Sequence, residues 1–272
     1  MDTTFRASHP VAWLFHRNTS RWLHNSLDGG LDGADVPQAP KEHPLTPFVP
    51  LPDRGVPTGF EDLLLRRNSC RRFDGGSIGL PRLGRVLSAG YGVSGHSRLG
   101  ALEFLDRPVP SGGGLYPLEV YVIARAVDGL TPGVYHYAPV LAGLEQLREV
   151  DIPARLLTYL FMGQSLAAEA ACVVVLTAVV SRSLGKYGDR GYRYLMFEAG
   201  HVAQNTNLAA IDQGLGACNL GGFFDDELAA LLTVDIDLEI PLYATALGVP
   251  ASHRRDEQRA FEEERHPPGL ST

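Results

Sequence analysis

The chain contains little cysteine and no long apolar run. Its 272 residues include three cysteines, Cys70, Cys172 and Cys218, which lie far apart and form no C-x-x-C pair. This pattern indicates neither a disulfide framework nor a zinc site, and Cys172 lies in an apolar segment expected in the core. No segment approaches the run of about 18 apolar residues that spans a bilayer, and the N-terminus lacks a signal-peptide pattern. We therefore expect a cytoplasmic protein.

Positive charge is scarce as well. The net charge is -7 and the pI is about 5.7, which argues against a general nucleic-acid binder, because neutralising phosphates requires clustered Lys and Arg. A hydrophobic content of 44% with 20% charged residues is typical of a globular protein with a large core. We expect one main domain over 59–250. It follows an N-terminal short helix and proline-rich arm (1–58) and precedes a charged tail (251–272).

The hydrophobic pattern mixes helices with strands. Residues 5–24 indicate one short amphipathic helix, and the prolines between residues 36 and 57 exclude a helix or an inner strand there. Further on, the pattern predicts helices over 59–67, 80–89, 190–213 and 225–232, the last capped by Asp225. It predicts strands over 118–127, 133–137, 171–180, 215–220 and 242–249. The outcome is an α+β layered protein.

The predicted helix after residue 190 is unusually polar for a core element. If it buries Tyr194, Phe197, His201 and Leu208, the side chains of His201, Gln204 and Asn205 lie near one inward edge. Buried polar groups need partners, and a ligand can supply them. The alternative is a helix whose charged groups are solvated and whose other polar groups are satisfied locally.

Two loop-like motifs suit an anionic or planar ligand. Arg67-x-Ser69-x-Arg71 offers two cations and a hydroxyl to one phosphate, although a solvated basic helix end is an equal alternative. Pro110-Ser111-Gly112-Gly113-Gly114 precedes a strand, and its backbone N–H groups can approach a ring or an anion. It is not a Walker A motif, because neither Lys-Ser nor Lys-Thr follows and the next element is a strand. A plain flexible loop is the alternative.

A second glycine-rich turn, residues 214–223, follows the long helix. The order of all these motifs resembles the nitroreductase-like flavoprotein family, and within it the SagB-type dehydrogenases, which include azoline oxidases. The resemblance covers about residues 60–250. Besides the segments above, it rests on Gly133-Val134-Tyr135-His136-Tyr137, Lys186-Tyr187-Gly188-Asp189-Arg190-Gly191-Tyr192-Arg193 and Glu198-Ala199-Gly200-His201-x-x-Gln204-Asn205. Phe15-His16 and Thr19 also resemble the short N-terminal piece of this branch.

The resemblance implies a three-layer α+β sandwich, with a mixed, mostly antiparallel sheet, that binds FMN as a homodimer in which both chains build each flavin site. By this analogy the phosphate and ribityl end of FMN is held by Arg67, Ser69 and Arg71. The 111–114 loop faces the flavin ring from the neighbouring chain, and backbone N–H groups near the flavin N5 come from Gly221 and Gly222. The cofactor-binding residues implied in this way are Arg67, Ser69, Arg71, Pro110, Ser111, Gly112, Gly113, Gly114, Gln204, Leu220, Gly221, Gly222, Arg254 and Arg255.

The same resemblance assigns catalysis to Lys186 and Tyr187. Oxidising a thiazoline or oxazoline removes one proton and one hydride, so the site needs a base beside the flavin. Either residue serves only with a lowered pKa, through burial for Lys186 or through neighbouring cations such as Arg190 and Arg193 for Tyr187. A solvated Lys186 and a packing Tyr187 are the structural alternative.

The sequence thus predicts an FMN-dependent dehydrogenase that acts on a peptide-like or carrier-bound heterocycle, delivered to it by a biosynthetic complex. Lys186-Tyr187 favours this hypothesis over an NAD(P)H-dependent nitro or quinone reductase. A non-catalytic flavin-binding scaffold that assists another modifying enzyme is the third hypothesis.

Overall fold

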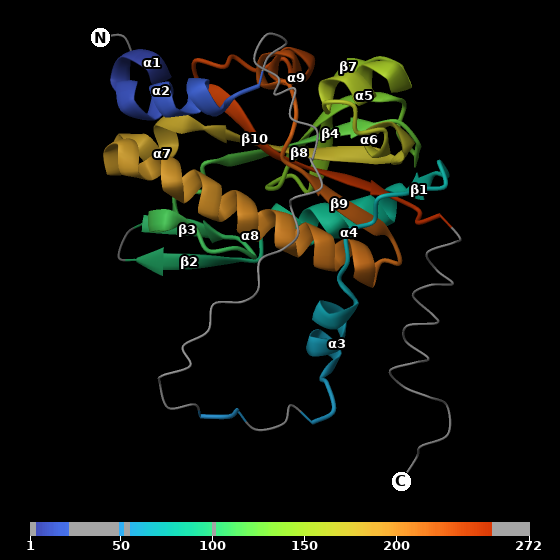
Figure 1. The fold of residues 1–272 in the computed structure, drawn as a ribbon. Helices are drawn as coiled ribbons and strands as arrows, with labels where there is room; N and C mark the ends of the chain where they lie inside the picture. The colour runs from blue at the N-terminus through green and yellow to red at the C-terminus, as the bar shows by residue number, and fades with distance from the viewer. Residues whose placement is uncertain (1–3, 22–48, 52–54, 100–101, 252–272) are drawn as a thin grey trace.

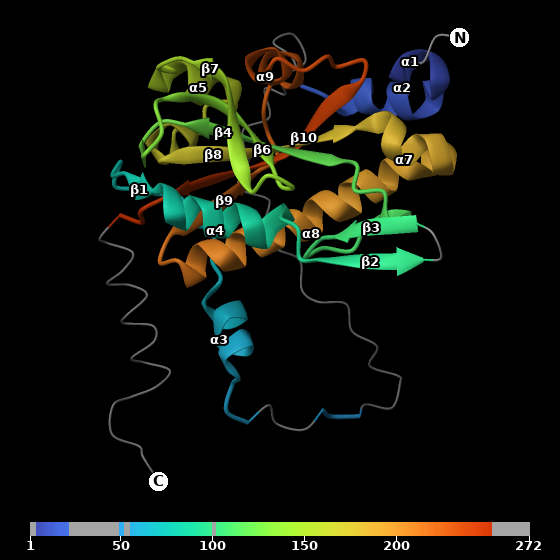
Figure 2. The same cartoon turned by 180° about the vertical axis from the view of Figure 1, so that it is seen from behind.

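The computed structural model describes residues 4–21, 49–51, 55–99 and 102–251, which form a three-layer α+β sandwich (Figures 1 and 2). Its central sheet has the order β7-β6-β4-β8-β10-β9, and every neighbouring pair is antiparallel. The strands are β4 (Leu118–Ala124), β6 (Gly133–Ala138), β7 (Gly143–Glu149), β8 (Cys172–Val179), β9 (Gly216–Leu220) and β10 (Glu239–Gly248). The predicted fold class is confirmed.

Alternating side chains on the inner strands produce two cores. Val120 and Val122 of β4 pack with α4 (Leu80–Tyr91) and α8 (Gly191–Asp212), below the sheet in Figure 1. Tyr121 and Ile123 pack on the opposite face with α5 (Ala154–Leu160), α6 (Leu166–Glu169) and α9 (Asp225–Leu232). Because side chains alternate across a strand, covering both faces requires the almost wholly apolar β4 and β8.

Smaller elements surround this sandwich. A hairpin joins β2 (Gly95–Leu99) to β3 (Leu102–Asp106), and β1 (Ile78–Gly79) pairs in parallel with β5 (Val127–Asp128). The remaining elements are α1 (Phe5–Ser8), α2 (Pro10–Thr19), α3 (Gly59–Arg66), α7 (Val180–Tyr187) and the 3₁₀ turns η1 (Gly112–Gly114) and η2 (Gly188–Arg190). The sequence pattern did not reveal the hairpin, β7, α5, α6 or α7. The α7 helix was missed because it follows β8 without a turn.

Most predicted elements exist with shifted ends, and two local predictions are wrong. The N-terminal helix is two helices that meet at His9, because Pro10 opens α2 where a missing N–H costs nothing. The cap of α9 is Phe224, whereas Asp225 is already helical and accepts a hydrogen bond from the Arg21 N–H (2.8 Å). Most of the proline-rich arm and of the C-terminal tail lies outside the described residues.

The predicted inward face of α8 is also wrong. Phe197 is 57% exposed, His201 and Gln204 are exposed, and Tyr194 is only half-buried. The buried face instead carries Tyr192, Leu195, Glu198, Ala199, Val202, Ala203, Thr206, Asn207 and Ala210. This face packs closely on α4, since a Cβ atom at Gly90 would lie 2.8 Å from Thr206 Oγ1. Small residues decide which face of α8 is buried, because they allow the close approach.

We predict opposite effects of alanine at two glycines of α4. Gly90→Ala should lower the free energy of unfolding by about 1–3 kcal/mol, because the new methyl group overpacks against Thr206. Gly84 is exposed with nothing within 4 Å, so Gly84→Ala should raise stability by about 0.5–1 kcal/mol. Urea denaturation of both variants measures this difference, and equal effects would contradict the close helix contact.

Candidate functional site

The loop before β4 is a well-defined turn. Gly113 and Gly114 have φ angles of 68° and 65°, and Tyr116 has 44°. Ser111 closes the loop, because its carbonyl accepts from the Gly114 N–H (3.0 Å) and its Oγ accepts from the Tyr116 N–H (2.9 Å). The left-handed backbone explains the glycines, since other residues adopt these angles at a cost.

This loop lies directly against the end of α7 and the first turn of α8. A Cβ atom on Gly113 would overlap the Tyr187 hydroxyl and lie 2.7 Å from Lys186 Nζ. One on Gly112 would lie 3.3 Å from the ring of Tyr194, which meets the Tyr187 ring edge-on at 4.9 Å. Lys186 is exposed, with Nζ 5.3 Å from the centre of the Tyr187 ring. The structure thus joins the predicted loop to the predicted catalytic pair, and we call these residues the glycine-loop cluster: Ser111, Gly112, Gly113, Gly114, Lys186, Tyr187 and Tyr194.

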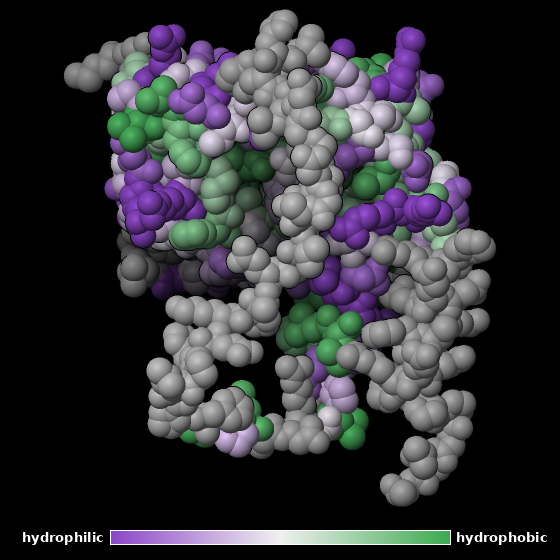
Figure 3. Space-filling model, in the orientation of Figure 1, coloured by the Kyte–Doolittle hydropathy of each residue, from purple (hydrophilic) through white to green (hydrophobic). Residues whose placement is uncertain are grey.

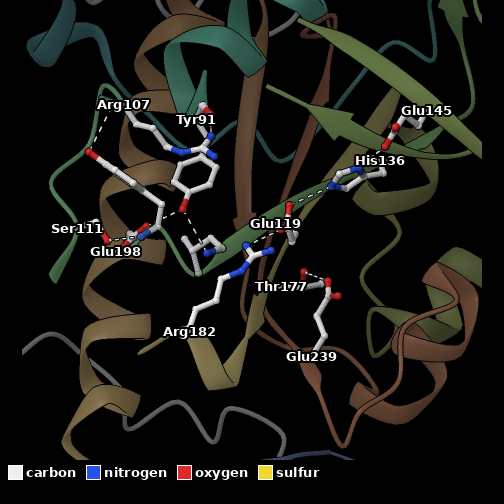
Figure 4. A network of polar contacts seen from close by, with 12 residues as sticks. Tyr91, Arg107, Ser111, Glu119, His136, Glu145, Thr177, Arg182, Glu198 and Glu239 are labelled. Atoms are coloured by element: carbon white, nitrogen blue, oxygen red, sulfur yellow. Dashed lines mark hydrogen bonds and ion pairs between the residues drawn. The ribbon is translucent and has the colours of Figure 1, made fainter. Parts of the chain in front are cut away.

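A buried polar network supports the loop from behind (Figure 4). Glu198, 2% exposed on α8, accepts from the Tyr91 hydroxyl (2.7 Å) and from Ser111. The Tyr91 hydroxyl in turn accepts from the Leu118 N–H (3.2 Å). Burial raises the pKa of Glu198, although the hydrogen bonds from Ser111 and Tyr91 and the charge of Arg107 oppose the shift. The sequence motif contained Glu198, but only the fold reveals that it anchors the loop to α4 and α8.

Arg67, Ser69 and Arg71 lie elsewhere, along the edge strand β9. The Cys70 N–H donates to the Ala217 carbonyl (2.8 Å), and a Cβ on Gly216 would lie 2.6 Å from Cys70 Sγ. Further along, the Asp74 N–H donates to the Val249 carbonyl (3.0 Å) and Phe73 forms a bridge with Pro250, so Cys70 and its neighbours lie at the edge of the sheet where β9 begins. Within the described residues neither Arg67 nor Arg71 forms an ion pair.

A pocket of about 390 Å³ opens just after the end of β9, at Gly221 and Gly222. Its walls include His16, Thr19 and Arg21 at the end of α2, Met162, and Tyr192 and Met196 of α8. His16 is 3% exposed, and its Nδ1 lies 3.0 Å from the Tyr192 hydroxyl. Burial and the Arg17 guanidinium lower the pKa of His16 to about 4, against the opposing Asp226 carboxylate, so His16 is neutral at pH 7. The N-terminal segment therefore helps to form this pocket.

The glycine-loop cluster and the Gly221–Gly222 pocket lie on different sides of α8. Tyr194 contacts the loop, whereas Tyr192 lines the pocket, and residues two apart on a helix point about 200° apart. Of the other predicted cofactor residues, Leu220 ends β9 beside the pocket, whereas Pro110 and Gln204 are exposed. Arg254 and Arg255 lie outside the described residues.

Two other kinds of site are not found in the described part of the chain. No group of three or more His, Cys, Asp or Glu side chains there could hold a metal ion. No described helix combines the length and apolar character needed to cross a membrane.

The chain is similar in sequence and in fold to several known proteins. The protein named putative nitroreductase MJ1384, of Methanocaldococcus jannaschii, is 35% identical over 189 residues, or 70% of this chain and 90% of MJ1384. The microcin B17-processing protein McbC of Escherichia coli is 29% identical over 146 residues, which span 52% of this chain and only 54% of McbC. A chain of the Escherichia coli microcin synthetase McbBCD complex, solved with truncated pro-MccB17, shares the fold with a TM-score of 0.68 at 21% identity, covering 88% of this chain and 91% of that chain.

The chain also matches the model of the nitroreductase family, and this match agrees with the fold and the motifs described above. It extends over residues 64–249, which contain the six-stranded sheet, the glycine-loop cluster and Arg67, Ser69 and Arg71, which we call the arginine segment. Members of this family use FMN. The chain belongs to the nitroreductase family.

Proposed function

We propose that this protein is an FMN-dependent dehydrogenase that oxidises a thiazoline or oxazoline in a peptide-like or carrier-bound substrate to the aromatic azole. The observation that carries the proposal is the contact of Lys186 and Tyr187 with the glycine loop at Gly113. The similarity to McbC, a protein named for processing microcin B17, supports a peptide substrate.

The residues present suit FMN. Arg67 and Arg71, with Ser69 between them, offer charge-assisted hydrogen bonds to a phosphate. Gly221 and Gly222 bring backbone N–H groups to a pocket wall without side chains of their own. When bound, FMN supplies the acceptor for the hydride and its electron pair.

Lys186 and Tyr187 would handle the proton. The reaction gives the azoline ring one new double bond, as one proton leaves to a base and one hydride leaves with two electrons. The ε-amino group and the phenol are the two candidate bases at the glycine loop, and their shared approach to Gly113 aims both at one point. Lys186 is exposed in the single chain, so the burial that its role as a base requires would have to come from the second chain of the proposed dimer. Tyr194 packs edge-on against Tyr187 and restricts its ring.

A homodimer with shared sites explains the division of the candidate residues between two sides of α8. In this arrangement the loop of one chain faces the flavin held by the arginines and glycines of the other. Exposed apolar side chains offer a surface for the second chain, namely Leu14 and Phe15 of α2 and Met196 and Phe197 of α8. Hydrophobic colour gathers over these elements on the face shown in Figure 3. Delivery of the substrate by a complex is supported by the fold shared with a chain of the McbBCD assembly.

Reduction of nitro compounds or quinones with NAD(P)H is the alternative, which the similarity to MJ1384 favours. A test with azoline-containing peptides beside nitroaromatics and NADPH separates the two activities. Turnover of neither substrate by flavin-loaded protein would favour the non-catalytic scaffold instead.

We predict that the purified protein carries FMN, seen in its visible spectrum and identified by chromatography after heat release. Arg71→Ala should weaken FMN binding about 10- to 100-fold, since a hydrogen bond to a charged group contributes about 1.5–3 kcal/mol. The neighbouring exposed Arg72 provides the control, and Arg72→Ala should bind FMN as the wild type does. Equal losses in both variants, or a colourless protein that takes up no FMN, would contradict the assignment.

We predict that Lys186→Ala or Tyr187→Phe lowers azoline oxidation about 10²–10⁴-fold, the usual contribution of a general base. The bound FMN should remain, because neither residue belongs to the arginine segment. Steady-state rates per bound flavin measure the effect. Unchanged oxidation in both variants would remove the proposed catalytic pair.

We predict that alanine at Gly113 is more harmful than at Gly114. Both glycines have positive φ, so both substitutions cost backbone strain of about 1–2 kcal/mol. Only a Cβ at Gly113 meets Lys186 and Tyr187, whereas one at Gly114 meets nothing within 4 Å. Azoline oxidation per bound flavin should therefore fall much further in Gly113→Ala, and equal rates would show that this contact has no role.

A further inference from the structure

A polar network lies beside the glycine loop but belongs to neither group of candidate residues (Figure 4). His136 of β6 bridges two carboxylates, with Nε2 3.0 Å from Glu119 and Nδ1 2.8 Å from Glu145. The other oxygen of Glu119 pairs with the Arg182 guanidinium at 2.5 Å. We call Glu119, His136, Glu145 and Arg182 the Glu119 network.

Glu119 is the most protected carboxylate of this network. Its side chain is 19% exposed, against 55% for Glu145. Burial opposes its ionisation, but hydrogen bonds from His136 and Arg182 outweigh burial and lower its pKa. Two partners on different elements, the His136 ring and the Arg182 guanidinium, therefore hold an ionised Glu119 in one place.

The position of Glu119 in the chain connects the loop to α7. Glu119 is the second residue of β4, which follows the glycine loop directly, and Arg182 lies in the first turn of α7. Lys186 is four residues after Arg182, so both lie on the same face of the helix. At the same junction the Val179 N–H donates to the Pro117 carbonyl (2.9 Å). The Glu119–Arg182 pair thus spans the two elements that meet at Gly113.

We propose that Glu119 is a positioning residue, which holds Lys186 and Tyr187 against the glycine loop by fixing α7 through Arg182. The consequence for catalysis rests on the proposed function, whereas the mechanical coupling does not. A single ion pair whose guanidinium is 43% exposed is screened by solvent and contributes little to global stability, so the expected effect is on the local order of α7 rather than on folding.

His136 makes this coupling dependent on pH. Its hydrogen bond to Glu119 raises its pKa against the effect of burial, and Glu145 raises it further. Protonated His136 therefore supports Glu119 fully below its ordinary pKa of about 6.5, and this support is lost as the pH rises through the raised value. The groups around His136 are Tyr121 on β4, Glu145 on β7, Arg182 on α7 and, across a cavity of about 630 Å³, Glu103 and Arg107.

The test compares Glu119→Gln with Glu145→Gln in the flavin-loaded full-length protein. Glu145 shares His136 with Glu119 but does not touch Arg182, so it is the matched control. The substrate is an azoline-containing peptide at pH 6. Glu119→Gln should lower kcat about 10-fold, a barrier increase of about 1.4 kcal/mol, while KM and FMN content stay unchanged. The kcat of Glu145→Gln should stay within about twofold of the wild type, which is less than half of that barrier change. In the wild type, kcat should fall as the pH rises through the raised pKa of His136. This fall in kcat should start at a lower pH in Glu145→Gln and should be absent in Glu119→Gln.

Hydrogen–deuterium exchange of the α7 peptide supplies a readout that needs no activity. Faster exchange at residues 180–187 in Glu119→Gln and Arg182→Met, but not in Glu145→Gln, is the expected result. If the wild type fails to oxidise azolines yet α7 shows this pattern, the proposed function is wrong and the coupling stands. Unchanged exchange in Glu119→Gln, or equal effects of both glutamate variants, would overturn the coupling.

Discussion

The antiparallel pairing of β4 with β8 is the constraint on which the candidate catalytic group depends. Leu118, the first residue of β4, pairs with Ala178 near the end of β8. Antiparallel neighbours place the start of one strand beside the end of the other, so the glycine loop before β4 meets α7, which follows β8 without an intervening loop. Residues more than seventy positions apart, Gly113 and Lys186, come into contact for this reason.

The loop is held by polar groups that the fold has removed from water. Tyr91 and Glu198 come from the two helices below the sheet, and together they satisfy Ser111 and the Leu118 N–H. Burying a carboxylate is costly unless hydrogen bonds accompany it, and Oε2 of Glu198 has no partner within the described residues. The hydrogen bonds that Glu198 does accept hold the loop in one conformation, which suits the approach of its backbone to a planar cofactor in the proposed function.

The candidate residues lie on two faces of α8, and in the proposed dimer the second chain brings the two groups together. The Gly221–Gly222 pocket takes part of its wall from α2, a helix before the segment that matches the family. The glycine-loop cluster lies on another face of the same helix. In the proposed dimer each chain would complete the site of the other, and the Glu119 network would position Lys186 and Tyr187 in the half that each chain contributes to its partner.

The sequence by itself determined the fold class and the motifs that chemistry needs. An apolar run such as 171–180 predicts a strand that is buried on both faces. A glycine such as Gly113 is typical of a left-handed backbone, and both predictions need only the local sequence. The buried face of α8 and the first residue of α9 could not be predicted in this way, because partners distant in the chain, such as α4 for α8 and Arg21 for α9, decide them. Phe197 is exposed whereas Ala199 and Ala203 are buried, because small side chains allow α8 to pack closely on α4. Only the tertiary structure could bring Glu119 to Arg182 and Gly113 to Tyr187, because strand pairing, not sequence spacing, sets those distances.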